Sequence, residues 1–143
     1  MKNIPNIKTF VVDDDPFFLN VMEQVLNNLG IEDVTTFSNG FTLENNLHQK
    51  PEVIFLDYNL EETTGYEVLK KVKRYDPDVY VVLISAQGEI KPAVDTLKHG
   101  AFDYIQKSSN TENQVEQVLN KILEVKDTLE KSKPTLLKRL FQF

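Results

Sequence analysis

The sequence contains no cysteine, and this absence excludes several kinds of chemistry at once. A disulfide framework, a cysteine-based zinc site and a thiol nucleophile all require that residue. The chain also has no apolar run of bilayer length, and residues 1–5 lack the long apolar region of a secretory signal. Neither a dinucleotide-type Gly-rich fingerprint nor a P-loop follows any apolar run. We therefore expect a cytoplasmic location, no membrane contact and no nucleotide site.

The 143 residues are enough for one ordinary domain, and 41% apolar with 27% charged residues is typical of a globular protein with its own core. The charge is unevenly distributed. Residues 1–125 carry 20 acidic and 11 basic side chains, whereas residues 126–143 carry two acidic and five basic ones. An acidic body disfavours nucleic-acid binding, which depends on neutralising phosphates, so we expect no nucleic-acid partner for this chain.

Short apolar, β-branched runs alternate five times with segments of helical spacing. The runs predict strands at Thr9–Val12, Val34–Phe37, Val53–Leu56, Val79–Ile84 and Phe102–Ile105. The third and fourth are almost continuously apolar, as in parallel strands that are covered on both faces. Five strand–helix units in one short chain predict an α/β fold with a single parallel sheet, because crossover connections are right-handed.

The segments between the strands carry the apolar stripes and the start signals of helices. One stripe begins at Phe18, a second contains Val94 and Leu97, and a third begins at Val115 and continues to Leu129. Three helix starts are expected, each from a capping residue in front of a helical stripe. They are Asp15 before Pro16, Thr64 with Glu67, and Thr111 with Gln114.

The residues that follow the strands suggest a site. Asp13, Asp14 and Asp15 follow the first strand, Asp57 and Asn59 the third, Ser85 the fourth and Lys107 the fifth. In a parallel sheet these ends share one edge, where ligands bind. Clustered carboxylates repel one another unless a cation is present, and Mg²⁺ prefers oxygen ligands. A carboxylate beside that ion can attack phosphorus, with Lys107 and Ser85 stabilising the phosphoryl oxygens.

The same residues give the chain a resemblance to the receiver domain of two-component response regulators. The matching motifs are Phe10–Pro16, Val53–Leu60, Gly65–Leu69, Val82–Ala86 and Gly100–Lys107, in order and at family-like spacings. The resemblance implies a flavodoxin-like, doubly wound, five-stranded parallel sheet with strand order 2-1-3-4-5. It places the receiver domain at residues 1–125, followed by a C-terminal extension, 126–143, that continues the last helix and ends in a basic amphipathic tail.

The resemblance also implies roles for individual residues. Asp57 would accept a phosphoryl group from a histidine kinase or a histidine phosphotransfer protein. Asp14, Asp57 and the backbone carbonyl of Asn59 would ligate Mg²⁺, and Asp13 would act through water. Ser85 would be the switch hydroxyl that is drawn to the phosphate, and Tyr104 the aromatic that turns inward behind it. Phosphorylation would thereby change a surface for a downstream protein partner. Self-association through the continued last helix is a further expectation.

Two positions depart from the family pattern, and two other functions share parts of it. Ser108 follows Lys107 where proline is usual, which leaves the geometry of that peptide bond open, and Glu61 also replaces a common proline.

A haloacid-dehalogenase-like phosphohydrolase would need a second aspartate where this chain has Asn59. A phosphate-independent binding module would have no need for all the carboxylates together with Ser85 and Lys107. We therefore expect a signalling domain and not an enzyme.

Overall fold

Five parallel strands lie side by side in the order β2-β1-β3-β4-β5. The structure is a computed structural model and describes residues 4–86, 88 and 91–133. The strands are β1 (Thr9–Val12), β2 (Val34–Phe37), β3 (Val53–Asp57), β4 (Tyr80–Ser85) and β5 (Asp103–Gln106). The helices are α1 (Pro16–Asn28), α2 (Gly40–Glu44), the short 3₁₀ helix η1 (Leu47–Gln49), α3 (Gly65–Tyr75), α4 (Lys91–Lys98) and α5 (Thr111–Ser132).

The predicted fold is confirmed, including the strand order. Every neighbouring pair of strands is parallel, and Val11 of β1 is in register with Thr36 of β2 and Phe55 of β3. The first two strands have the bounds predicted from the sequence. The last two begin and end one residue later, and β3 is one residue longer, so Asp57 is the last residue of the strand.

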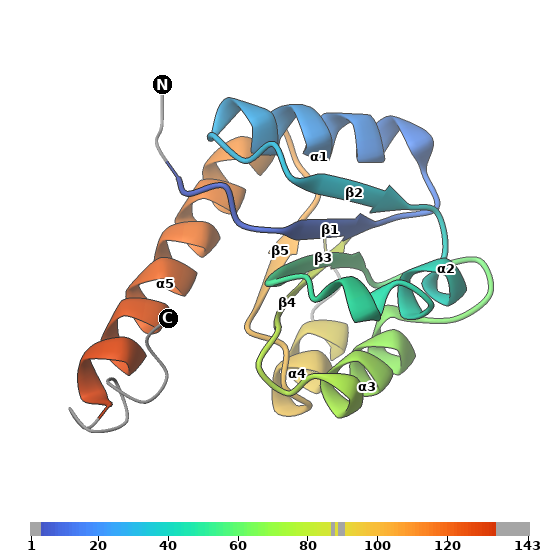
Figure 1. Cartoon of the computed structure of the whole chain (residues 1–143). Helices are drawn as coiled ribbons and strands as arrows, with labels where there is room; N and C mark the ends of the chain where they lie inside the picture. The colour runs from blue at the N-terminus through green and yellow to red at the C-terminus, as the bar shows by residue number, and fades with distance from the viewer. Residues whose placement is uncertain (1–3, 87, 89–90, 134–143) are drawn as a thin grey trace.

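The helices cover the sheet on both faces, as Figure 1 shows, with α1 and α5 on one side and α2, α3 and α4 on the other. Successive side chains of a strand point to opposite faces, so each strand contributes to two cores. Val11 and Phe55 pack with Phe18 and other residues of α1 and α5. Phe10 and Ile54 pack on the opposite face with residues of α3. The carboxyl edge between these two layers is fixed in place by both cores.

Two of the three predicted helix starts are confirmed. The side chain of Asp15 accepts from the Phe17 amide in front of α1, and that of Thr64 accepts from the Glu67 amide in front of α3. The prediction for α5 is wrong. Asn110 occupies the capping position, and Thr111 is the first helical residue. The buried hydroxyl of Thr111 donates to the Ser108 carbonyl at 2.7 Å instead, because the turn before α5 folds back over it.

The predicted core stripe of α4 is also wrong in part. Val94 and Leu97 are 46% and 47% exposed, whereas Thr96 is fully buried. The Thr96 carbonyl accepts from the amides of His99 and Ala101, and its hydroxyl donates to the Ala93 carbonyl. These bonds turn Thr96 inward at the end of the helix, so the two apolar side chains beside it face outward.

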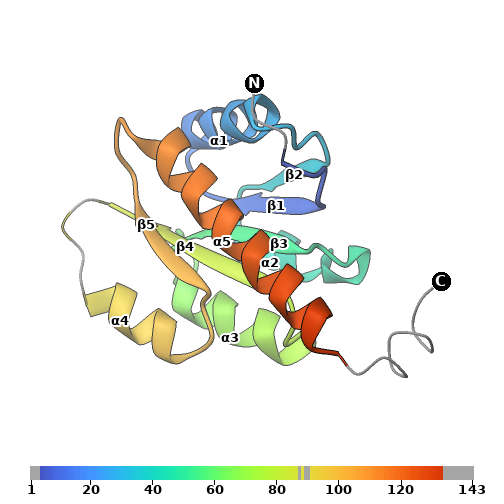
Figure 2. The same cartoon turned by 90° about the vertical axis from the view of Figure 1, so that its left-hand side faces the viewer.

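The last helix continues past the point where the domain was predicted to end. In Figure 2, α5 crosses one face of the sheet and extends beyond it, and the helix is continuous from Thr111 to Ser132. Its first half is buried at Val115, Leu119 and Ile122, but Leu129 is 55% exposed. The tail that follows, 134–143, lies outside the described residues. Among the helices of the described part of the chain, none is both long and apolar enough to cross a bilayer.

Candidate functional site

Four strand ends meet at the carboxyl edge of the sheet. Asp13 follows β1, Asp57 ends β3, Ser85 ends β4 and Lys107 follows β5. The first three are buried, with 1%, 4% and 0% of their surface exposed. Lys107 is held there by its own backbone, since its amide donates to the Ser85 carbonyl at 2.8 Å. The sheet therefore brings together the residues that the sequence assigns to one site.

Lys107 lies between the two buried carboxylates. Its Nζ is 2.8 Å from Oδ2 of Asp13 and 3.7 Å from Oδ2 of Asp57. The other oxygen of Asp13, Oδ1, accepts the amide of Asp15 at 2.8 Å. Oδ2 of Asp13 is buried and accepts no hydrogen bond of regular geometry from a described residue, so the ion pair is its main interaction. A single ammonium group thus interacts with two buried carboxylates.

This arrangement shifts the pKa values of all three groups. Burial, followed by the repulsion from Asp13, raises the pKa of Asp57 to about 7, even though Lys107 and the Asn59 amide act in the opposite direction. Burial also raises the pKa of Asp13, against the hydrogen-bonding and charge effects of Lys107. Burial lowers the pKa of Lys107, but the two carboxylates outweigh it, and the net direction is upward.

The third carboxylate of the cluster is Asp14, which is half-buried. Asp13, Asp14 and Asp57 each offer one carboxylate oxygen, and these oxygens all lie within 4.8 Å of one another. An all-oxygen donor set with a surplus of negative charge fits Mg²⁺ better than a softer metal. The raised pKa of Asp57 also favours a cation at this site, and so does the buried Oδ2 of Asp13, which accepts no regular hydrogen bond. Both observations show that one ammonium does not balance the clustered carboxylates.

The loop after β3 is held close to the site by a glycine. The Gly65 amide donates to the Tyr58 carbonyl at 2.6 Å, and a bridge pairs Asn59 with Thr64 across the loop. A Cβ on Gly65 would lie 2.7 Å from the Asp57 carbonyl oxygen and 2.9 Å from Cδ1 of Leu83. No side chain fits there without a shift of the backbone. The start of α3 is therefore packed directly against the end of β3.

The hydroxyl of Ser85 connects the site to β5. Ser85 Oγ is hydrogen bonded to the Tyr104 hydroxyl, and it also donates to the Ala86 carbonyl at 3.2 Å. The Tyr104 ring is partly buried and packs against the core on the α3 face of the sheet. The predicted switch pair is thus in direct contact, with the aromatic ring turned inward.

The backbone around Lys107 is regular. The described residues contain no cis peptide bond, so the Lys107–Ser108 bond, which the sequence left open, is trans. The turn that follows is closed by side chains. Ser108 Oγ accepts the Asn110 amide at 3.1 Å, and the Ser108 carbonyl accepts the Thr111 hydroxyl.

Sequence reasoning missed two contacts at the site. The Lys107 ammonium lies 4.5 Å from the centre of the Phe18 ring, a distance at which a cation and an aromatic face attract each other. The helical pattern assigns Phe18 only to the core stripe of α1, although its place one turn after the acidic cluster could have suggested the contact. Glu62 accepts the Gly40 amide at 2.7 Å and thereby ties the loop after β3 to α2. No sequence pattern indicates that bond.

Comparison with known proteins agrees with this geometry. The family model of the response regulator receiver domain matches residues 9–120, most of the described chain. The chain belongs to this family. Receiver domains are signalling modules and not enzymes in the usual sense, so the predicted signalling function is confirmed.

Three relatives of this receiver domain differ in overall length. The chemotaxis protein CheY of Thermotoga maritima is 27% identical over 116 residues, which cover 80% of this chain and 96% of CheY. The nitrogen assimilation regulatory protein NtrX of Azorhizobium caulinodans is 35% identical over 107 residues, which cover 73% of this chain but only 24% of NtrX. The BeF3-activated DrrB receiver domain is 29% identical, with a TM-score of 0.69 over 80% of this chain and 97% of that receiver domain.

Proposed function

We propose that this receiver domain is phosphorylated on Asp57 by a phosphohistidine of a histidine kinase or a histidine phosphotransfer protein. In that reaction the nitrogen–phosphorus bond of the donor breaks, and a bond forms between phosphorus and a carboxylate oxygen of Asp57. The single observation that carries the proposal is the position of Asp57. It is 4% exposed at the end of β3, among two further carboxylates, with an ammonium within 3.7 Å.

The cofactor of this proposal is Mg²⁺. Asp14, Asp57 and the Asn59 carbonyl would bind it directly, and Asp13 would bind it through water. When bound, the ion supplies positive charge that stabilises the ionised carboxylates and the incoming phosphoryl oxygens. An ionised Asp57 is the nucleophilic form, and its pKa of about 7 in the absence of a metal means that a cation would increase this form at neutral pH.

Lys107 and Ser85 are proposed to bind the phosphoryl group after transfer. The Lys107 ammonium already lies within 4 Å of both buried carboxylates, so a short movement from Asp13 toward the new dianionic group suffices. Ser85 Oγ would exchange its bond with the Tyr104 hydroxyl for one with a phosphoryl oxygen. This exchange is the proposed switch, because it releases Tyr104 from the position that it holds in the described structure.

The surface that responds is proposed to be the one formed by α4, β5 and α5. Tyr104 belongs to β5, and the exposed Val94 and Leu97 lie on the neighbouring helix α4. Exposed apolar side chains on one helix are typical of a protein-binding surface. A downstream protein partner that prefers one position of Tyr104 would shift the population of the two states. A cytoplasmic location is part of the same proposal.

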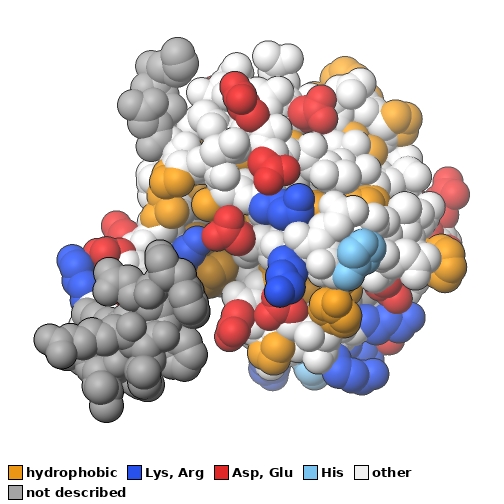
Figure 3. Space-filling model, viewed as in Figure 1, with side chains coloured by type: hydrophobic (Ala, Val, Ile, Leu, Met, Phe, Trp, Pro, Cys, Tyr) orange, Lys and Arg blue, Asp and Glu red, His pale blue; other side chains and the backbone are white. Residues whose placement is uncertain are grey.

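A homodimer through α5 is the second possible outcome of the switch. The helix runs to Ser132, beyond the edge of the sheet, and so offers a further surface on which a second copy could pack. Light scattering during size-exclusion chromatography, with and without beryllofluoride, tests the idea, and a monomer in both conditions would rule it out. We do not propose nucleic acid as a partner, and on the face seen in Figure 3 acidic and basic side chains are interspersed without a continuous basic patch.

The decisive experiment is phosphorylation by a small donor. The protein is incubated with acetyl phosphate and Mg²⁺, and its intact mass is measured for the wild type and for Asp57→Asn. We expect the mass of one phosphoryl group on the wild type and none on the variant. The proposal is wrong if the wild type remains unmodified, or if the variant is modified to the same extent.

A further inference from the structure

A partly apolar groove lies at the amino edge of the sheet, opposite to the edge that carries Asp57. It runs between the last turns of α5 and the turns that precede β4 and β5. The apolar part of its lining consists of Pro77, Val79, Phe102, Val125 and Leu129. Val125 and Leu129 are 37% and 55% exposed, although they continue the stripe that is fully buried at Ile122. The described residues leave this part of the stripe without a covering layer.

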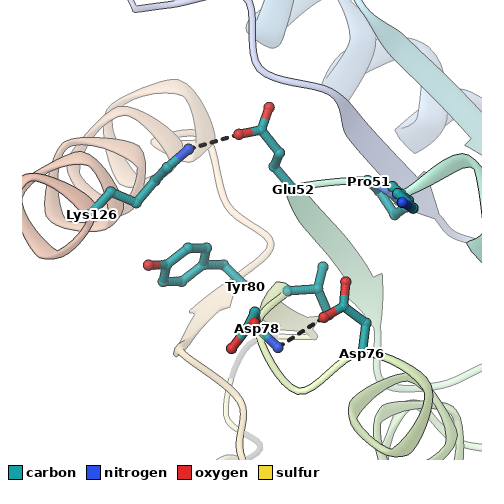
Figure 4. Close-up of a pocket in the computed structure, with 8 residues that line it drawn as sticks. Pro51, Glu52, Asp76, Asp78, Tyr80 and Lys126 are labelled. Atoms are coloured by element: carbon teal, nitrogen blue, oxygen red, sulfur yellow. Dashed lines mark hydrogen bonds and ion pairs between the residues drawn. The ribbon is translucent and has the colours of Figure 1, made fainter. Parts of the chain in front are cut away.

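An ion pair connects α5 with the sheet beside the groove. Lys126 of α5 reaches Glu52, the residue before β3, and their Nζ and Oε1 atoms are 2.7 Å apart. Figure 4 shows this contact. Glu52 also accepts the Lys8 amide at 3.2 Å, so its carboxylate has two partners. The helix is therefore in contact with the sheet as far as Lys126, and its last turn extends beyond that contact.

The rim of the groove carries charges of both signs. Asp78 and Lys73 line it, and Asp76 lies on the adjoining hollow seen in Figure 4. Within the described part of the chain neither carboxylate takes part in an ion pair, and the Asp76 side chain accepts the amide of Asp78. The Lys73 ammonium donates to the carbonyls of Pro77 and Val79, at 2.7 and 2.8 Å. Burial lowers the pKa of Lys73, although the negative charges of Asp76 and Asp78 act in the opposite direction.

The segment 134–143 has the complementary composition. Its sequence, PTLLKRLFQF, combines three leucines and two phenylalanines with Lys138 and Arg139 and contains no acidic residue. It also begins at the right place. α5 ends at Ser132, Lys133 after it has an extended backbone at φ −67° and ψ 138°, and a proline comes next in the sequence. The chain therefore leaves the helix axis directly beyond the groove.

The connection is long enough for the segment to return to the groove. Val125 lies eight residues before Lys133, which corresponds to about 12 Å along a helix. Ten residues in an extended conformation span up to about 33 Å. A tethered segment is also present at an effective concentration of about millimolar, so it has the advantage over a second molecule that binds the same groove.

We propose that residues 134–143 of the same chain dock into this groove, with their apolar side chains against Val125, Leu129 and Phe102 and with Lys138 and Arg139 on the side of Asp76 and Asp78. The segment thereby closes the core that α5 leaves uncovered at the amino edge. Because this surface lies away from Asp57, the inference does not depend on the proposed phosphorylation.

The test uses the full chain and the absence of cysteine. Gln142→Cys introduces a single thiol for a nitroxide spin label without removing an apolar side chain of the segment. Paramagnetic broadening of backbone amide signals is then measured in the ¹⁵N-labelled protein. We expect loss of signal intensity at Val79, Phe102 and Leu129, and little loss at Asn59 on the opposite edge. Leu129→Asp should restore the intensity at Val79 and Phe102. The matched variant Thr128→Asp, which adds the same charge on the neighbouring exposed residue, should not.

Three results would overturn the proposal. The first is an unbroadened groove in the full chain, and the second is equal broadening in the Leu129→Asp and Thr128→Asp variants. The third is broadening in a mixture of ¹⁵N-labelled wild type and unlabelled, spin-labelled chain, which would assign the groove to a second copy. The same spectra report whether α5 and the sheet remain folded in each variant, so loss of the fold cannot be mistaken for loss of docking.

Discussion

Lys107 and Asp13 form an ion pair in which one partner is in contact with solvent and the other is not. Their Nζ and Oδ2 atoms are 2.8 Å apart; the side chain of Lys107 is 29% exposed and that of Asp13 only 1%. The same ammonium is 3.7 Å from Asp57, so a single positive charge faces two buried negative ones. The negative charge of the site thus exceeds its positive charge. The stability of the folded domain should therefore depend on pH and on Mg²⁺.

The metal-free protein should lose stability as the pH rises through the range between the two pKa values of Asp57. An aspartate carboxyl in the unfolded chain has its ordinary pKa of 3.8, whereas burial beside Asp13 raises the pKa of Asp57 in the folded state to about 7. Between these values the folded state keeps a proton that the unfolded chain has released, so the free energy of unfolding falls with rising pH. We expect a loss of a few kcal/mol between about pH 4 and pH 7 in urea unfolding with a chelator present.

Asp57→Asn is the control for this pH dependence. The amide has nearly the same shape but does not titrate, so the variant should be more stable than the wild type at slightly alkaline pH and should show a flatter pH profile. The remaining slope comes from the other groups, including Asp13, whose pKa is raised in the same direction. Equal profiles for the two proteins would mean that Asp57 does not carry the effect.

Mg²⁺ should stabilise the wild type and should lose this effect when one ligand is removed. A ligand that binds only the folded state adds about 2.7 kcal/mol at a hundred times its dissociation constant. Asp14→Asn removes a carboxylate of the cluster and should strongly reduce this gain. Asp15→Asn is the matched control, because asparagine caps α1 as well as aspartate does and Asp15 is not one of the three clustered carboxylates. The measurement is the shift of the thermal midpoint with added Mg²⁺. If the two variants lose the gain to the same extent, the assignment of Asp14 as a ligand is wrong.

Gly65→Ala should damage both stability and metal binding, although the residue carries no chemistry. The new methyl group would lie 2.7 Å from the Asp57 carbonyl oxygen and 2.8 Å from the Tyr58 Cα, and backbone atoms cannot move aside cheaply. We expect a destabilisation of about 1–3 kcal/mol, as for other overpacked positions. The loop that carries Asn59 would move with α3, so the Mg²⁺ affinity should fall as well. Urea unfolding and Mg²⁺ titration check the two effects, and an unchanged affinity would mean that the loop does not depend on this contact.

Most of the fold and the meeting of the four strand ends could be predicted because both depend on local patterns. Apolar runs located the five strands to within one residue, and parallel strands necessarily place their carboxyl ends together. Asp13, Asp57, Ser85 and Lys107 each follow or end such a run. Their meeting point therefore follows directly from the parallel sheet.

The parts that could not be predicted depend on tertiary contacts. Val94 and Leu97 face outward while Thr96, whose carbonyl accepts from the turn after α4, is buried. Asn110 takes the capping position of α5 because the Thr111 hydroxyl bonds to the Ser108 carbonyl. In both places a stripe or capping pattern competes with a polar contact that a one-dimensional pattern does not reveal.

The hydrogen bond between Ser85 and Tyr104 should oppose activation, and Tyr104→Phe should therefore favour it. In the described structure the Tyr104 hydroxyl is hydrogen bonded to Ser85 Oγ. The proposed switch requires that Ser85 Oγ bind a phosphoryl oxygen instead. Phenylalanine keeps the partly buried ring but removes this competing bond, whose net contribution is about 1 kcal/mol. We expect a somewhat lower free energy of unfolding and an apparent affinity for beryllofluoride that is about fivefold higher, the factor that this energy corresponds to.

The matched control is Tyr80→Phe, which removes a hydroxyl at the amino edge of the sheet, where Tyr80 lines the groove beside α5. This variant should leave the beryllofluoride affinity unchanged, because its hydroxyl is remote from Ser85. Amide chemical shifts of β5 and α4 during the titration report the binding. If Tyr104→Phe binds the analogue as weakly as the wild type or more weakly, then Tyr104 supports Ser85 in the active state instead of restraining it. The tyrosine would then be a positioning residue, and the restraint on the switch would lie elsewhere in the contacts between α4 and β5.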